Sequence, residues 1–355
     1  MGDEATDVRR GDELDLARVG DFVRRALPEL DGALELLQFP GGSANLTYLL
    51  RVGPTELVLR RPPFGTLAPG AHDMRREYKV LSRLWEHFDR APRAFAFCDD
   101  PEVAGADFFL MERRRGEVVR DELPDSLRRQ PDIGRRLGLA LVDAFADLAL
   151  LSPEACGLAD LGKPAGFIER QVSGWANRWS RVKEDNPLPI MDDVAARLAD
   201  TIPTSTVVAL VHNDPKMDNC QFDPAGPDRV TAIFDWDMTT VGDPLADLGT
   251  LLNYWPDPSD PPGAWRGSNE GLRAFGLPTR REVVERYRAR TGFDCSRAGW
   301  YEAFAQWKTA VVVAQLHHRW LQGDSANPRH ETIAEAVPVL AASADQLLDV
   351  ELASG

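Results

Sequence analysis

The chain contains little cysteine, and its cysteines are not arranged in pairs. Its 355 residues include four cysteines, Cys98, Cys156, Cys220 and Cys295, and no two of them form a C-x-x-C motif. This spacing excludes the usual structural zinc motifs and a disulfide framework, so we expect a reducing compartment. The acidic N-terminus also lacks the apolar stretch of a signal peptide, which predicts a cytoplasmic location.

Long apolar runs and an excess of positive charge are also missing. No segment reaches the roughly 18 consecutive apolar residues that indicate a membrane-spanning helix. The 41 Lys and Arg residues are outnumbered by 56 Asp and Glu residues, which gives a net charge of −15. A surface of this sign repels nucleic acid and anionic lipid, so we expect neither nucleic acid nor a membrane as a partner. The sequence leaves the oligomeric state open.

The composition and length that remain are typical of a soluble globular protein. Hydrophobic residues make up 43% of the chain and charged residues 27%. A chain of 355 residues exceeds one average domain but suits two lobes around a single cleft.

The periodicity of the first 116 residues predicts an antiparallel sheet with one inserted helix. Residues 1–30 are expected to form a tail and a helix, since apolar residues from Leu14 to Leu30 recur with a helical period. Residues 31–116 are expected to form the N-lobe, with a helix at His72–Phe88. Its five predicted strands are Leu34–Phe39, Leu46–Val52, Glu56–Arg60, Phe95–Asp99 and Phe108–Arg113.

After Gly116 the pattern becomes mainly helical. Residues 253–276 are rich in Pro and Gly and are predicted to form an irregular loop. We therefore expect residues 117–355 to form a larger, mainly helical C-lobe, and the fold class to be α+β. The predicted helices are Ile133–Leu151, Pro164–Lys183, Val194–Ile202 and residues 281–291, 297–321 and 330–352.

A short polar segment between two apolar runs carries the most specific chemical signal. His212, Asp214 and Asn219 fit the pattern H-x-D-x-x-x-x-N. The apolar run Val207–Val211 precedes this segment, and a second run, Val230–Phe234, ends in Asp235-Trp236-Asp237. An acidic surface hairpin would explain the His and Asn as turn caps. The flanking apolar runs instead favour a strand–loop–strand unit, which is the context that a catalytic loop requires.

This unit supplies the groups that kinase-type phosphoryl transfer needs. Such a reaction requires an Asp to orient the attacking hydroxyl, together with oxygen ligands for Mg²⁺. We expect Asp214 to be the catalytic base and Lys216 to reach the γ-phosphate. Asn219 and Asp235 are predicted metal ligands, and Asp237 is a further candidate. The sequence thus predicts a bilobal fold of the protein-kinase type.

The predicted N-lobe offers candidates for binding the nucleotide. Glycines between the first two strands would let backbone N–H groups approach phosphate oxygens. Arg60, at the end of the third strand, would contact the α- and β-phosphates while Glu77 orients it, and Arg61 is a competing candidate. The end of the fifth strand would form the hinge that meets adenine. The candidate nucleotide-binding residues are Gly41, Gly42, Ser43, Asn45, Arg60, Glu77, Met111, Glu112 and Arg113.

Together these blocks resemble the aminoglycoside phosphotransferase-like superfamily, and within it the branch that also occurs fused to acyl-CoA dehydrogenases. The resemblance extends over most of residues 15–250 and includes Gly242-Asp243-Pro244-Leu245-Ala246-Asp247-Leu248. It implies ATP as donor, Mg²⁺ as cofactor and a hydroxylated small molecule as acceptor, with the C-terminal helices forming the acceptor pocket. Two residues depart from the family pattern: Arg60 replaces a Lys, and Asn213 replaces a Gly.

Two other functions are compatible with parts of the pattern. Arg60 in place of Lys motivates a non-catalytic, pseudokinase-like nucleotide-binding protein. The Asp235-Trp236-Asp237 segment superficially matches the D-x-D loop of a Mg²⁺-dependent phosphohydrolase, but that reaction gives the His212–Asn219 block no role. The sequence leaves open whether ATP or GTP is the donor. The acceptor, too, stays open among an antibiotic, an amine alcohol, a sugar and a hydroxyacyl compound.

Overall fold

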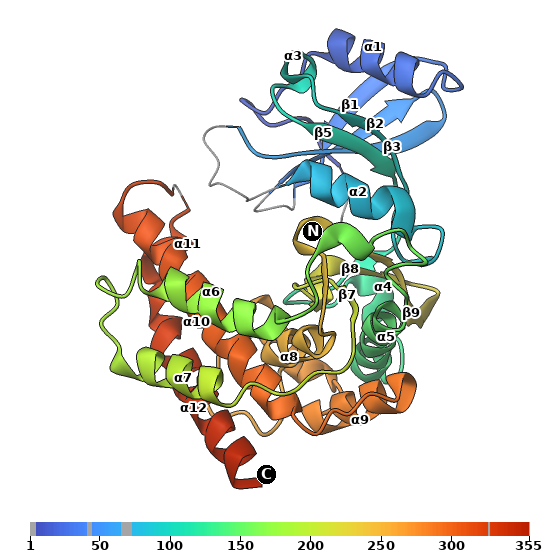
Figure 1. Ribbon diagram of the computed structural model, residues 1–355. Coiled ribbons are helices and arrows are strands. Elements are labelled where there is room, and N and C mark those ends of the chain that lie inside the picture. Colours follow the sequence, from blue (N-terminus) through green and yellow to red (C-terminus); the bar gives the residue numbers. More distant parts are fainter. Residues whose placement is uncertain (1–4, 41–44, 65–72, 326, 355) are drawn as a thin grey trace.

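The chain folds into two lobes. A computed structural model describes residues 5–40, 45–64, 73–325 and 327–354. In Figure 1 the lobe with the large β-sheet lies above a larger, mainly helical lobe. This arrangement confirms the predicted α+β bilobal fold. The predicted phosphate-binding residues Gly41, Gly42 and Ser43 lie outside the described residues.

The N-lobe sheet contains the five predicted strands, with each end within one residue of its expected position. All neighbouring strands pair antiparallel, in the order β1-β2-β3-β5-β4. The strands are β1 (Leu34–Gln38), β2 (Leu46–Val52), β3 (Thr55–Arg61), β4 (Ala94–Cys98) and β5 (Phe108–Glu112).

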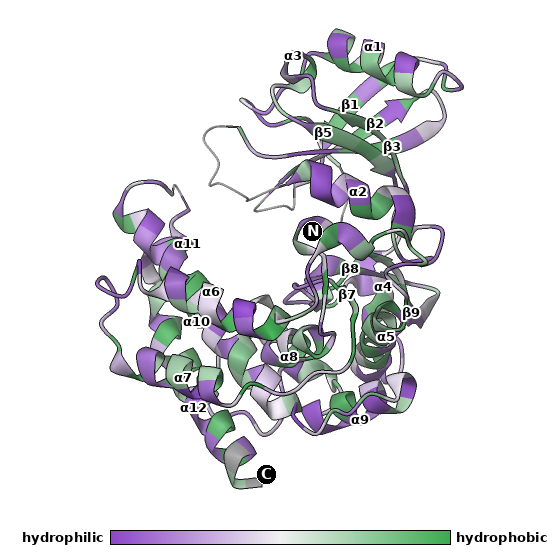
Figure 2. Cartoon of the chain, in the orientation of Figure 1, coloured by the Kyte–Doolittle hydropathy of each residue, from purple (hydrophilic) through white to green (hydrophobic). Residues whose placement is uncertain are grey.

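The two faces of this sheet serve different cores, because side chains alternate along each strand. Leu57 and Leu59 pack with helix α1 (Leu16–Ala26) on the outer face. Val58, between them, faces the inner core with helix α2 (Met74–Leu84). Figure 2 shows hydrophobic colour along β5 and mixed purple and green along α2, as expected for a helix with one face toward solvent. Arg60 lies on the same inner side as Val58, so it points toward the C-lobe.

Helix α2 is shorter than the predicted His72–Phe88. It begins after Asp73, whose carboxylate accepts a hydrogen bond from the backbone N–H of Arg76 at 3.0 Å. This N-cap fixes the start of the helix, and turns follow its last residue, Leu84. The N-lobe also contains the short helix α3 (Pro101–Ala104).

The C-lobe is built from helices around two hydrophobic cores. One core continues from the inner core of the N-lobe and lies between α5, α9 and the strands that follow residues 212–219, and the other lies between α6, α7, α10 and α12. The helices are α4 (Asp125–Arg128), α5 (Ile133–Ala149), α6 (Phe167–Trp179), α7 (Pro189–Asp200), α8 (Leu245–Asn253), α9 (Arg280–Thr291), α10 (Ala298–Leu321), α11 (Arg329–Thr332) and α12 (Ala336–Ser354).

Short strands and 3-10 helices complete the C-lobe. Strands β6, β8 and β9 form an antiparallel sheet, and β7 pairs with β10. The strands are β6 (Glu117–Val118), β7 (Ala209–Val211), β8 (Cys220–Asp223), β9 (Gly226–Ile233) and β10 (Thr240–Gly242). The 3-10 helices are η1 (Ala159–Leu161), η2 (Met217–Asn219), η3 (Trp236–Met238), η4 (Gly267–Phe275) and η5 (Ile333–Glu335).

Two predictions for the C-lobe need correction. The helix expected at Val194–Ile202 begins earlier, at Pro189, because proline is well suited to the first turn of a helix. The segment 253–276 is not irregular throughout, since it contains η4.

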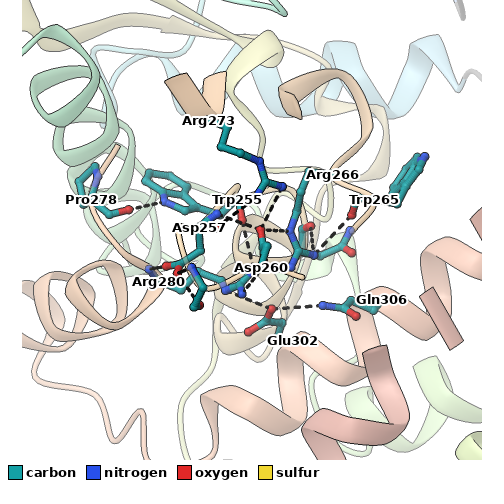
Figure 3. A network of polar contacts seen from close by, with 12 residues as sticks. Trp255, Asp257, Asp260, Trp265, Arg266, Arg273, Pro278, Arg280, Glu302 and Gln306 are labelled. Carbon is teal, nitrogen blue, oxygen red and sulfur yellow. Dashed lines mark hydrogen bonds and ion pairs between the residues drawn. The ribbon is translucent and has the colours of Figure 1, made fainter. Parts of the chain in front are cut away.

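A buried ionic network anchors this segment. The Asp260 carboxylate is fully buried and accepts hydrogen bonds from Arg266 at 2.5 and 3.0 Å and from Arg280 at 2.6 Å (Figure 3). Arg280 also lies 3.6 Å from Glu302 of α10. The segment is thereby tied to α9 and α10.

The sequence predicts neither disulfides nor a membrane-spanning helix, and the described residues can be compared with both expectations. All four cysteines are buried and free of disulfides. Among the helices that the structure describes, none is both long and apolar enough to cross a lipid bilayer.

Candidate active site

The predicted catalytic segment follows strand β7 and begins with a strained backbone. Asn213 has φ = 71°, in the left-handed region that non-glycine residues seldom occupy. The Gly that the family resemblance implies at this position would adopt this conformation without steric cost. Asn is the residue that tolerates this region best after Gly.

Asp247 of α8 holds the start of this loop. Its two carboxylate oxygens accept hydrogen bonds from the backbone N–H groups of His212 and Asn213, both at 2.7 Å. Burial raises the pKa of Asp247 to about 7, against the opposing effect of these two hydrogen bonds. Both carboxylate oxygens of Asp247 are used by the backbone, so Asp247 has a structural role in holding the loop.

His212 is placed as a neutral structural residue. Its Nε2–H donates to the carbonyl of Phe234 at 2.9 Å, while Nδ1 accepts from the N–H of Asp214 at 3.3 Å. Its ring also packs edge-on against Trp236, with ring centroids 4.8 Å apart. Burial lowers the pKa of His212, which favours the uncharged ring. His212 thus joins the catalytic segment to the segment that carries Asp235.

Lys216 and Asn219 both contact one carboxylate oxygen of Asp214. Oδ2 of Asp214 lies 2.7 Å from the Lys216 ammonium and accepts a hydrogen bond from Nδ2 of Asn219 at 3.0 Å. Burial lowers the pKa of Lys216, but the charges of Asp214 and Asp218 outweigh it and raise that pKa above its ordinary value. The Asn219 amide nitrogen is used in this way, so its carbonyl oxygen is the atom left for a metal.

Asp235 is joined to the N-lobe through Arg60. It precedes η3 with φ = 70°, a second left-handed non-glycine residue at the site. The Arg60 guanidinium forms an ion pair with Asp235 and, through Nε, a second pair with Glu77 at 2.8 Å. Glu77 therefore orients Arg60 as predicted, and Arg60 reaches the Asp235 carboxylate as well.

Asp237 lies near this group. Burial and the charge of Asp235 raise the pKa of Asp237 to about 6. Among the described residues, no group of three or more His, Cys, Asp or Glu side chains is arranged to hold a metal. Asp235, Asp237 and the Asn219 amide carry oxygen atoms of the type that Mg²⁺ binds when phosphates and waters supply its other ligands, and they stay candidate ligands.

A cleft of about 740 Å³ lies between the lobes. Nine of the residues predicted to contact nucleotide or metal line it: Asn45, Arg60, Glu77, Met111, Glu112, Arg113, Lys216, Asn219 and Asp235. Asn45 is only 3% exposed, and neither polar atom of its side chain has a hydrogen-bond partner in the described part of the chain. Asp214 and Asp237 lie beside this group and do not line the cleft.

The competing candidate Arg61 is excluded from the cleft. It is buried on the other side of β3, where it donates to the carbonyls of Pro62 at 3.0 Å and Ala104 at 2.6 Å. This placement follows from strand geometry, since neighbouring side chains point to opposite faces.

Other residues that line the cleft were not predicted from the sequence. Val58 and Phe39 of the N-lobe and Phe234 of the C-lobe offer apolar surface, and Gln221 of β8 offers a buried amide. The alternation of side chains along the predicted strands, and along those that flank the motif, could have placed these residues on the cleft side. The strand β8 itself was missed because it is only four residues long.

Comparison with known sequences identifies relatives. The profile of the phosphotransferase enzyme family, APH, matches residues 35–283. Acyl-CoA dehydrogenase family member 11 of Rattus norvegicus is 29% identical over 343 residues, covering 94% of this chain and 43% of the relative. Family member 10 of Mus musculus is 30% identical over 299 residues, covering 83% of this chain and 27% of the relative. The chain thus spans less than half the length of these relatives.

Comparison with solved structures identifies the same fold. A protein of Ralstonia eutropha, provisionally named an aminoglycoside phosphotransferase, has a TM-score of 0.79 and 25% identity, covering 95% of this chain and 99% of that one. A mutant of aminoglycoside phosphotransferase APH(4)-Ia, in a ternary complex with AMP-PNP and hygromycin B, has a TM-score of 0.57 and 17% identity, with coverages of 93% and 97%. The second likeness is one of fold alone. Both confirm the kinase-like architecture, and the sequence relatives confirm the predicted branch.

Proposed function

This chain belongs to the phosphotransferase enzyme family, and from that premise we propose that it transfers the γ-phosphate of ATP to a hydroxyl of a small molecule in a Mg²⁺-dependent reaction. The observation that carries the proposal is the convergence of Asp214, Lys216 and Asn219 at one carboxylate, next to a cleft lined by Arg60 and Asp235. Positioning and charge neutralisation are the main demands of phosphoryl transfer, and these side chains meet both.

Asp214 is the proposed base. Its Oδ2 is occupied by Lys216 and Asn219, while none of the hydrogen bonds among the described residues reaches its Oδ1. Oδ1 would therefore accept the proton of the acceptor hydroxyl and direct that oxygen at the phosphorus. Lys216 holds the carboxylate in place and would share its charge with the transferred phosphoryl group.

Asn219, Asp235 and Asp237 are the proposed metal ligands, and Arg60 is the proposed ligand of the donor phosphates. Mg²⁺, when bound, would neutralise charge on the triphosphate. Arg60 bridges Glu77 and Asp235 in the nucleotide-free protein. A bound triphosphate would offer the guanidinium a further anionic partner. We therefore expect Arg60 to keep its ion pair with Glu77 and to divide its remaining N–H donors between Asp235 and phosphate oxygens.

Thermal unfolding in the presence of nucleotide tests this proposal. Mg²⁺ with ATP at about 100 times its Kd should stabilise the wild type by about 2.7 kcal/mol, since a ligand that binds only the folded state shifts the equilibrium. Asp235→Ala should remove the Mg²⁺-dependent part of the shift. The matched control is Asp193→Ala, because Asp193 is an exposed aspartate on α7. A wild type that no nucleotide stabilises, with or without Mg²⁺, contradicts the proposal.

Slow ATP hydrolysis separates catalysis from mere nucleotide binding. Asp214→Asn keeps the shape of the side chain but removes the base, so it should abolish hydrolysis and leave the nucleotide-dependent stabilisation in place. Hydrolysis that is equal in wild type and variant would favour the pseudokinase-like alternative. The acceptor can then be sought by following ADP release across a library of hydroxylated compounds, with Asp214→Ala as the blank.

A further inference from the structure

Helix α10 places a single lysine against the catalytic segment. Lys308 is the only charged residue between Ala303 and Leu316. Its ammonium donates a hydrogen bond to the backbone carbonyl of Asn213 at 3.2 Å. Lys308 lies beyond residue 283, where the family match ends. The segment therefore receives a contact from a part of the chain to which that match assigns no role.

The contact falls on Asn213, a residue that other groups also hold. Asn213 is held in its left-handed conformation by three groups: its N–H donates to Asp247 at 2.7 Å, its side-chain amide donates to the carbonyl of Met238 at 2.8 Å, and its carbonyl accepts from Lys308. The carbonyl of Asn213 belongs to the peptide bond that leads into Asp214. Rotation of that peptide would shift the backbone from which the Asp214 side chain extends, so the contact with Lys308 bears on the direction of the Asp214 carboxylate.

The surroundings of Lys308 act on its charge in opposite directions. Burial lowers the pKa of Lys308, and the neighbouring charges of Arg178 and Lys216 act in the same direction, whereas Asp214 and Asp247 favour the ammonium. The ammonium also lies 5.8 Å from the ring centroid of Trp175. An apolar residue would fill this position without the desolvation of a charge. Packing alone therefore does not account for a lysine here.

We propose that Lys308 is a positioning residue of the phosphotransfer site, which holds the Asn213–Asp214 peptide and so fixes the direction of the Asp214 carboxylate. The proposal rests on the proposed function for its chemistry, but the contact itself can be tested without turnover. Lys308→Met removes the ammonium at similar side-chain length, and Lys308→Arg retains a charged donor. The matched control is Lys183→Met, because Lys183 is an exposed lysine in the turn four residues after the end of α6.

Amide hydrogen exchange tests the contact directly. We expect the amides of residues 212–214 to exchange about tenfold faster in Lys308→Met, as the loss of one charge-assisted hydrogen bond predicts. Exchange in Lys308→Arg and Lys183→Met should match the wild type. Unchanged exchange of residues 212–214 in Lys308→Met overturns the proposal, and so does an equal acceleration throughout α8 and α10, which would indicate general loosening.

Basal hydrolysis of Mg²⁺–ATP, with water as acceptor, tests the consequence for Asp214. A misdirected carboxylate should lower kcat about a hundredfold in Lys308→Met with little change in KM for ATP, and Lys308→Arg should recover most of the loss. A rise in KM with kcat unchanged would show that Lys308 acts on nucleotide binding instead. If the wild type neither binds nor hydrolyses ATP, the phosphotransfer proposal fails, whereas hydrogen exchange still decides the contact.

Discussion

At the scale of single residues, Arg60 is the side chain whose role depends most on its chemical type. Its guanidinium is planar and presents several donors in a fixed fork, so it contacts Glu77 of α2 and Asp235 of the C-lobe at the same time. An ammonium has no such fork. The departure from the family lysine therefore creates a bridge between two carboxylates on different lobes.

Substitution of Arg60 should lower the free energy of unfolding, because it breaks this bridge between the lobes. Arg60→Met leaves the Glu77 carboxylate, which is 1% exposed, without its ion partner and should lower the free energy of unfolding by about 3–5 kcal/mol. Arg60→Lys should lose less, because it keeps one of the two pairs. Urea unfolding at pH 7 measures both losses, and equal losses for Met and Lys would contradict the bridge.

The sequence predicted local contacts of the candidate site better than distant ones. The proximity of Asp214 and Asn219 was predictable because their spacing is set by one loop, whereas their catalytic and metal-binding roles stay predictions. The pair of Arg60 with Asp235 joins residues 175 positions apart, and no local pattern encodes such a contact. The roles assigned to Gly41, Gly42 and Ser43 stay predictions.

At the scale of elements, the segment from Tyr254 to Phe275 shows why the irregular parts were harder to predict. Helices and strands carry a period in their apolar residues, whereas this segment is ordered by charges. Burial raises the pKa of Asp260, but hydrogen bonds from Arg266 and the backbone, together with the charges of Arg266 and Arg280, outweigh it and lower that pKa to about 2. Arg266 lies in the same segment and Arg280 opens α9, and such ion pairs leave no apolar period in the sequence, so the segment reads as a loop.

Asp260→Asn should destabilise the protein in a pH-dependent way. Because the folded-state pKa of Asp260 is depressed from an ordinary 3.8 to about 2, its charged form stabilises the fold above pH 4 and this contribution is lost as the pH falls toward 2. Near pH 7 the variant removes the carboxylate charge that the buried Arg266 guanidinium shares with Arg280, at a cost of about 3–5 kcal/mol. Urea unfolding from pH 7 to pH 3 should show the gap to wild type narrowing below pH 4. A gap that is constant with pH would contradict this account.

At the scale of the whole molecule, helix α2 ties the lobes together. Arg76 donates to the carbonyl of Thr239 at 2.8 Å and to the carbonyl of Leu161 at 2.7 Å, both in the C-lobe. Lys79 pairs with Asp160 at 2.7 Å on the same side. The bilobal architecture was predictable from the order of sheet, helix and motif. The contacts of α2 with the C-lobe were not, because the sequence does not distinguish a helix arginine or lysine that contacts the other lobe from one that faces solvent.

Neighbouring arginines allow a matched test of this tie. Arg76→Ala should lower the free energy of unfolding by about 1–3 kcal/mol, because two charge-assisted hydrogen bonds between the lobes are lost. Arg75→Ala should change it by less than about 0.5 kcal/mol, since Arg75 is exposed and its ion pairs among the described residues, with Asp99 and Asp107, stay within the N-lobe. Small-angle scattering should also show a broader distribution of molecular dimensions for Arg76→Ala alone. Equal behaviour of the two variants would contradict a special role for Arg76.

The four buried thiols have a practical consequence for observing such motions. Cys98, Cys156, Cys220 and Cys295 are at most 5% exposed, and burial raises the pKa of each, so they are poor targets for maleimide reagents. Two cysteines introduced on the surface, one on each lobe, would therefore be labelled selectively in an otherwise natural background. A donor and acceptor dye attached in this way would report the opening and closing of single molecules as nucleotide is added.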